Sequence, residues 1–107
     1  MRVNFKFLSL LIVISIAAFS FISCSSPPED EIMAAEAAVK AALAAGADEF
    51  SPRLFDKAQS FLQEAKMLNE QGDYAGAKKK AEYALIRAEK SEKNADRLNE
   101  ARQRSDE

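Results

Sequence analysis

The chain has 107 residues, enough for one small domain, and it carries 15 basic and 17 acidic side chains for a net charge of −2. Nucleic-acid-binding domains are usually clearly basic, so this balance argues against nonspecific nucleic-acid binding. The chain has no histidine and a single cysteine, which excludes catalytic triads and histidine-based zinc sites. We therefore expect no enzymatic activity, no cofactor and no metal.

The N-terminus has the organisation of a secretory signal peptide. Arg2 and Lys6 precede an uncharged apolar run over residues 7–22. That run is shorter than the roughly 20 residues that span a bilayer as a helix. Small residues then lead to Cys24, the one cysteine of the chain. We predict a signal peptide over residues 1–23.

Residues 21–24, Phe-Ile-Ser-Cys, resemble the bacterial lipobox. Ser23 and Cys24 fit that motif, whereas Phe21 stands where leucine is usual. The resemblance implies cleavage between Ser23 and Cys24 and lipid attachment at the Cys24 sulfur, with acyl chains such as palmitate. Two or three chains, at about 0.8 kcal/mol per buried methylene, anchor a protein stably, whereas one does not.

Three other interpretations of Cys24 are open. An intramolecular disulfide needs a second cysteine, so only an intermolecular bridge would remain. A catalytic thiol needs a nearby base, and the chain lacks histidine. An uncleaved signal anchor is the third, because the apolar run is long for a signal peptide.

The expected location is the bacterial cell envelope, with the membrane contacted through the N-terminal lipid. Ser25 follows the cysteine, and lipoproteins of enteric bacteria that stay in the inner membrane carry aspartate there. The periplasmic face of the outer membrane is therefore favoured over the inner membrane or the cell surface. Residues 24–31 are expected to form the acylated N-terminus and a short tether.

A first helix is predicted over residues 27–45, because this segment is dense in alanine, the best helix former. Ser26 and Glu29 have capping-box spacing, with Pro27 at the first helical position. Gly46 is a natural stop. The predicted apolar stripe is Ile32, Ala35, Val39, Ala42 and Leu43.

A second helix is predicted over residues 52–71, with Ser51 as its cap and Pro52 in its first turn. Gly72 and Asp73 predict a tight turn into a third helix. The apolar face of the second helix consists of Leu54, Ala58, Phe61, Ala65 and Leu68, widened by Phe55 and Leu62.

The third helix is predicted over residues 74–103. Its apolar stripe is Tyr74, Ala77, Ala81, Ala84, Leu85 and Ala88. Beyond Lys90 the stripe fades, so we expect that end to be exposed, frayed or buried only in an oligomer. No strand pattern is present. The predicted fold is all-α: a helical domain over residues 32–107, whose last two helices form a hairpin with core 51–90.

Residues 61–85 resemble one tetratricopeptide-type helix pair. Phe61, Ala65 and Leu68 match the large-small-large positions of its first helix, residues 72–74 match its Gly-Asp-Tyr turn, and Ala77 and Ala84 match its second-helix contacts. The closing proline is replaced by Glu89, and no second repeat is present, although such solenoids need about three repeats.

A closer similarity is to a bacterial family of unknown function found in lipoproteins and ahead of outer-membrane-protein-A-like domains. Residues 44–89 carry its pattern: an Ala-Gly-Ala helix end, a Pro-x-x-(Leu/Phe) helix start with phenylalanine at its last position, and a Gly-Asp-Tyr-x-x-Ala turn before an alanine-rich basic helix. The resemblance implies an envelope lipoprotein built of helical hairpins, with no known reaction.

Three local features have both a functional and a structural interpretation. The first is a run of three lysines, Lys78, Lys79 and Lys80. Its functional interpretation is binding to anionic lipid or cell-wall polymer, and its structural interpretation is attraction to acidic residues across the bundle. Glu29, Asp30 and Glu31 would bind Ca²⁺ weakly, or could simply complement the helix dipole. Phe50 and Phe55 could form a small exposed patch, or belong to the core. We favour the structural interpretation of each.

The predicted function is a non-catalytic structural or adaptor role in the envelope, through helix-face contacts with an envelope protein. One alternative is a self-associating coiled-coil spacer, motivated by the stripe from Leu54 to Leu68; a homo-oligomer is therefore open. A second alternative is a ligand- or stress-sensing lipoprotein that uses Phe50 and Phe55.

Overall fold

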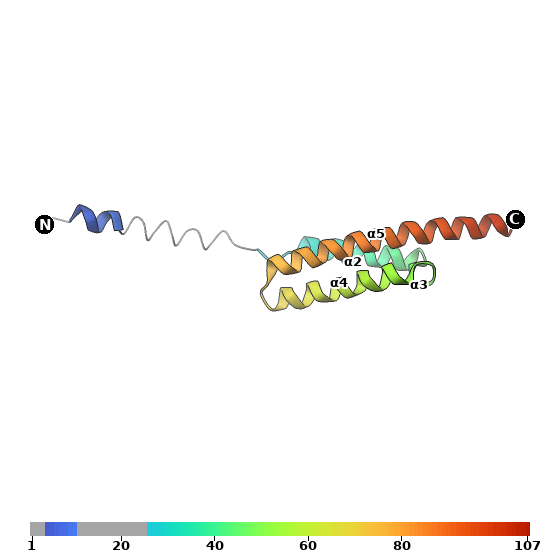
Figure 1. Cartoon of the computed structure of the whole chain (residues 1–107), viewed down its shortest axis with the longest axis horizontal. Helices are drawn as coiled ribbons and strands as arrows, with labels where there is room; N and C mark the ends of the chain where they lie inside the picture. The colour runs from blue at the N-terminus through green and yellow to red at the C-terminus, as the bar shows by residue number, and fades with distance from the viewer. Residues whose placement is uncertain (1–3, 11–25) are drawn as a thin grey trace.

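The structure, a computed structural model, describes residues 4–10 and 26–107 (Figure 1). Residues 5–10 are helical. The second range folds into α2 (Glu29–Ala44), α3 (Ala47–Phe50), α4 (Pro52–Glu70) and α5 (Tyr74–Ser105). Neither range contains a strand, which confirms the all-α prediction and its long C-terminal helix. The predicted cleavage and lipid attachment at Cys24 lie outside the described residues.

The start of α2 differs from the prediction. Pro28 occupies the N-cap position and no side chain caps the helix, so the expected capping box of Ser26 and Glu29 is wrong. The reason is local: a residue that precedes proline is disfavoured in the helical conformation, so Pro27 cannot begin the helix. Three acidic residues of the first turn instead complement the positive end of the helix dipole.

Gly46 ends the first helix as predicted. Its φ is 83°, a left-handed value that side chains other than glycine rarely adopt. The one-turn helix α3 follows at once, and its Ala47 is buried. Sequence analysis did not predict α3, since a single turn is too short to show a periodic pattern. Ser51 then takes the predicted cap position of α4, with Pro52 at the first turn, although its hydroxyl makes no capping hydrogen bond.

The turn between α4 and α5 forms as predicted. Gly72 has φ 84°, in the left-handed region. The Gly72 amide donates to the carbonyl of Asn69, and the Asp73 amide donates to the carbonyl of Leu68. The Asp73 carboxylate accepts a hydrogen bond from the Gly76 amide at 3.1 Å and so caps α5. This turn reverses the chain and lays α5 back along α4 (Figure 1).

The buried face of α5 consists almost wholly of alanine. α5 packs against both α2 and α4, and its buried residues, which alternate spacings of four and three, are Ala77, Ala81, Ala84, Ala88, Ser91 and Ala95. The prediction that the stripe fades beyond Lys90 is therefore wrong as far as Ala95, whereas residues 96–107 are exposed as expected, apart from the half-buried Asn99. Ser91 continues the stripe because it is small and its hydroxyl donates to the Ala88 carbonyl at 2.8 Å.

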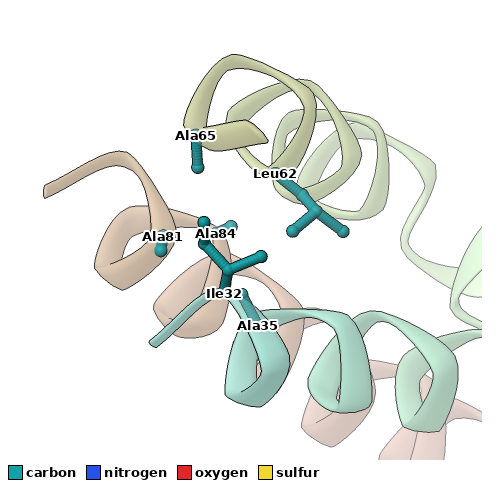
Figure 2. Packing of buried hydrophobic residues seen from close by; sticks show 6 residues of the cluster. All are labelled: Ile32, Ala35, Leu62, Ala65, Ala81 and Ala84. Atoms are coloured by element: carbon teal, nitrogen blue, oxygen red, sulfur yellow. The ribbon is translucent and has the colours of Figure 1, made fainter. Parts of the chain in front are cut away.

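Two clusters make up the core. The turn-side cluster, shown in Figure 2, lies near the α4–α5 turn and consists of Ile32, Ala35, Leu62, Ala65, Ala81 and Ala84. The α3-side cluster lies at the other end of the bundle and consists of Ala42, Ala47, Phe55 and Ala95. Val39 packs against both clusters. α5 contributes to each, so one helix connects the two clusters.

The predicted apolar stripes of α2 and α4 contain the residues that are buried, but the buried face of each helix is turned somewhat about the helix axis from its predicted position. Leu43 is 52% exposed, so its predicted place in the core is wrong. On α4, Phe55 and Leu62 are buried, whereas Leu54 and Leu68 are half-buried. The rotation arises because α4 packs against both α2 and α5, which centres its buried face between the two neighbours.

Candidate functional site

Ion pairs between helices account for two of the three consecutive lysines. Lys78 of α5 lies 3.7 Å from Glu31 of α2, and Lys80 lies 2.9 Å from Glu64 of α4. The two lysines thus reach to opposite sides of α5, toward different neighbours. Lys79 between them is exposed. The expected attraction to the acidic first segment is confirmed for Lys78, whereas Lys80 pairs with Glu64 of α4, so the run does not form one patch.

A third pair joins α2 to α4. Lys66 Nζ lies 2.6 Å from Glu36 Oε1. The hydrogen bond and the positive charge of Lys66 lower the pKa of the Glu36 carboxyl below its usual value, with a further small contribution from Lys40. Both side chains are exposed to solvent, so the pair orients the helices with little effect on stability.

Phe50 and Phe55 do not form an exposed patch, which agrees with the favoured interpretation that they belong to the core. Phe55 is 4% exposed and belongs to the α3-side cluster. Phe50 is half-buried, and the Arg102 guanidinium lies 5.9 Å from its ring centroid. Next to Phe50 an open groove of about 390 Å³ is lined by Asn94, Arg97 and Leu98. Only one of the two aromatic rings is therefore accessible.

Another aromatic pair marks the seam between α4 and α5. The rings of Phe61 and Tyr83 lie 5.5 Å apart, centroid to centroid. Lys80 Nζ lies 5.2 Å from the Phe61 ring centroid, within range of a cation–π interaction. These side chains identify which surface of α5 borders α4.

The described residues offer little for chemistry. Glu29, Asp30 and Glu31 follow one another in the first turn of α2, and no group of three or more potential metal ligands gathers anywhere in residues 4–10 and 26–107. Over the same ranges, no helix is long and apolar enough to cross a membrane.

Sequence analysis missed a basic face on α5. At about 100° per residue, five basic residues of α5 fall within about 60° of one another on the side opposite its alanine stripe. All five are exposed: Lys79, Lys90, Lys93, Arg97 and Arg104. The acidic residues of the same helix fall on the adjoining side, at Glu82, Glu89, Glu92, Asp96 and Glu100. One of them, Asp96, lines a pocket together with Lys90, Lys93 and Arg97. A helical projection of the charges, rather than a search for consecutive lysines, would have found this face.

Comparisons with known proteins return nothing for this chain: no family model, curated protein or solved structure matches it.

Proposed function

We propose that the protein is a lipid-anchored component of the bacterial cell envelope, with a non-catalytic structural or adaptor role. One observation carries the anchor: an apolar run behind two basic residues ends at Ser23-Cys24, directly before a short tether that contains serine, proline and acidic residues. A cysteine at that junction suits lipid attachment, and the chain has no histidine to activate its thiol.

The intact mass of the protein extracted from bacterial membranes tests the anchor. We expect a chain that starts at Cys24 and carries added acyl chains. The Cys24→Ala variant should keep its N-terminal segment and carry no lipid. An unmodified mass for residues 1–107 of the wild type would contradict the anchor and make the apolar run an uncleaved membrane segment.

The adaptor role is supported by apolar side chains on the outer surface of the bundle. Met33 of α2 is 65% exposed, and it is accompanied along the outer side of that helix by exposed alanines at positions 34, 37, 41 and 44. A helix surface of this kind suits packing against a helix of another protein, because small side chains allow close approach.

The alternative of a self-associating coiled-coil spacer is less well supported. It needs a free apolar stripe from Leu54 to Leu68, and Ala58 and Ala65 of that stripe are buried within the chain.

Photocrosslinking in intact cells tests the adaptor role. A photoreactive amino acid at Met33 should yield a crosslinked product with a second envelope protein. The same amino acid at Gln63, an exposed position on α4, is the matched control and should yield less of that product. Recovery of only the protein itself, or of the same products from both positions, would contradict an adaptor that acts through α2.

A further inference from the structure

We propose that the basic face of α5 docks the bundle onto an anionic phospholipid surface, as a second membrane contact beside the N-terminal anchor. The inference rests on the proposed function in one respect, since the anchor holds the bundle next to the bilayer. It goes beyond the proposed function because it assigns a binding surface to named residues and gives the bundle an orientation.

The first argument is that the cations of this face have few partners within the protein. Four cations elsewhere on the bundle are paired, namely Lys66, Lys78, Lys80 and Arg102. On the basic face, Arg104 lies 3.5 Å from Glu100, while the other four make no ion pair with the described residues: Lys79, Lys90, Lys93 and Arg97. Lys40 of α2 and Arg53 of α4 also make no ion pair with the described residues, but four of the unpaired cations are gathered on this one side of α5.

The second argument is that α4 extends the positive surface. α4 and α5 run antiparallel, and the contact of Phe61 with Tyr83 marks their seam. One turn from that contact, Lys57 follows on the same side of α4 and Arg87 on the same side of α5. Lys57 is exposed and Arg87 is half-buried. Like charges on both sides of a seam raise the local positive potential, which attracts an anionic surface.

The third argument is that apolar side chains stand among the charges. Ile86 lies at the centre of the basic face and is 52% exposed, and Tyr83 beside it is 39% exposed. Interfacial helices insert such side chains at the level of the lipid headgroups, while lysine and arginine extend their charged ends to the phosphates. A purely electrostatic contact with a hydrated polymer would not need these apolar groups, so the face suits a bilayer better.

The fourth argument is proximity. Only residues 25–28 separate Cys24 from the start of α2 at Glu29. An extended chain of that length spans about 17 Å, so the start of α2 remains within that distance of the lipid headgroups and the bundle is held beside the bilayer. The bilayer is then the nearest polyanion, and the tether gives it a high effective concentration at the basic face.

Depth-dependent fluorescence quenching tests the docking. The chain contains no tryptophan, so Ile86→Trp introduces a single probe at the centre of the face. The full-length protein is purified from bacterial membranes and reconstituted into vesicles of zwitterionic phosphatidylcholine, or of the same lipid with phosphatidylglycerol, each containing brominated acyl chains. We expect a blue-shifted emission and strong quenching only in the vesicles with phosphatidylglycerol.

Three further variants accompany this probe. Met33→Trp places the tryptophan on the outer side of α2, where we expect no quenching in either vesicle. In the Ile86→Trp background, changing Lys90, Lys93 and Arg97 to Gln should abolish the quenching, because each cation near an anionic surface contributes about fivefold to binding. Changing Lys40, Lys66 and Lys78 to Gln removes the same charge elsewhere and should leave the quenching in place. Circular dichroism verifies that each variant is folded.

Flotation of the vesicles separates this inference from the anchor. If the Ile86→Trp protein floats with both vesicles but its tryptophan emission is the same in both, the docking is overturned and the anchor stays intact. Protein that floats only with phosphatidylglycerol supports the docking and contradicts the anchor. Quenching of the Met33→Trp probe to the same extent as the Ile86→Trp probe overturns the proposed orientation. About 1 M salt, which shortens the screening length to about 3 Å, should release the docked face.

Discussion

The two core clusters of the bundle are built differently. In the turn-side cluster, two large aliphatic side chains, Ile32 and Leu62, come from different helices, and three further apolar residues pack around them. In the α3-side cluster, Phe55 is the one large buried side chain and the other buried members are alanines, with the half-buried Val39 and Phe50 packed against them. Where alanine fills most of a helix interface, the apolar area that each large side chain buries carries a greater share of the stability. The α3-side end should therefore depend mainly on Phe55.

Phe55→Ala should be the most damaging change. We expect a loss of about 3–5 kcal/mol, because the buried residues of its cluster are otherwise alanines, which are too small to fill the cavity. Leu62→Ala in the turn-side cluster should cost less, about 2–4 kcal/mol, since Ile32 and Leu85 can move into the space. Urea unfolding followed by circular dichroism measures both. A larger loss for Leu62→Ala would contradict the difference between the clusters.

Ala84→Leu tests whether the close packing in the turn-side cluster is required. Ala84 is fully buried between helices, so a larger side chain should force them apart at a cost of about 1–3 kcal/mol. Ala101→Leu makes the same change at an exposed position of α5 and should alter the stability by less than about 0.5 kcal/mol. Thermal unfolding of the two variants measures the effect, and equal midpoints would show that the interface is not tightly packed.

The cap of α5, just beyond the turn-side cluster, should contribute less. Asp73→Ala should cost about 1 kcal/mol through loss of the hydrogen bond to the Gly76 amide. Gly76→Ala should also destabilise, although alanine is the better helix former, because the new Cβ would lie 2.9 Å from the Asp73 Cγ. A double-mutant cycle measured by urea unfolding should show the two costs to be non-additive, with Gly76→Ala stabilising once Asp73 is alanine. Simple additivity would contradict this contact.

The smallest effect is expected from Glu36→Gln, which breaks the ion pair between α2 and α4. Because Lys66 lowers the pKa of Glu36, the pair stabilises the fold above the ordinary carboxyl range, and this contribution is lost as the pH falls through the lowered pKa. The wild type should exceed the variant slightly in stability near neutral pH and lose that advantage in acid. Denaturant titrations at both pH values, repeated in high salt, measure it. A difference that persists in acid would contradict an ionic origin.

The helix ends were the most predictable part of this fold, because single residues determine them. Gly46, Gly72 and Asp73 act through local backbone and capping chemistry, and all three act as predicted. Predictions that needed the neighbouring helices were less accurate. The sequence alone does not show that Ser91 would be tolerated in a buried stripe, or that Leu43 would face solvent.

The candidate sites differ in the same way, since some depend on local sequence and others on how the helices pack. The interpretation of Cys24 depends on local sequence alone and stays a prediction, since residues 11–25 are outside the described ranges. The consecutive lysines attracted attention because they are adjacent in sequence, yet Lys78 and Lys80 point to different helices. The basic face is dispersed over residues 79–104, and only the complete length of α5 brings its members into line.

The direction of the helices has a mechanical consequence. α2 and α5 run the same way, so the start of α2 and the end of α5 lie at opposite ends of the bundle (Figure 1). A pulling force applied between the tether and the C-terminus would slide α5 lengthwise along α2, loading every contact of that interface at once instead of peeling them apart in succession. A force along this direction therefore acts on the α2–α5 interface as shear. The lifetime of the folded bundle under such a force would be set by the rate of forced unfolding rather than by its equilibrium stability.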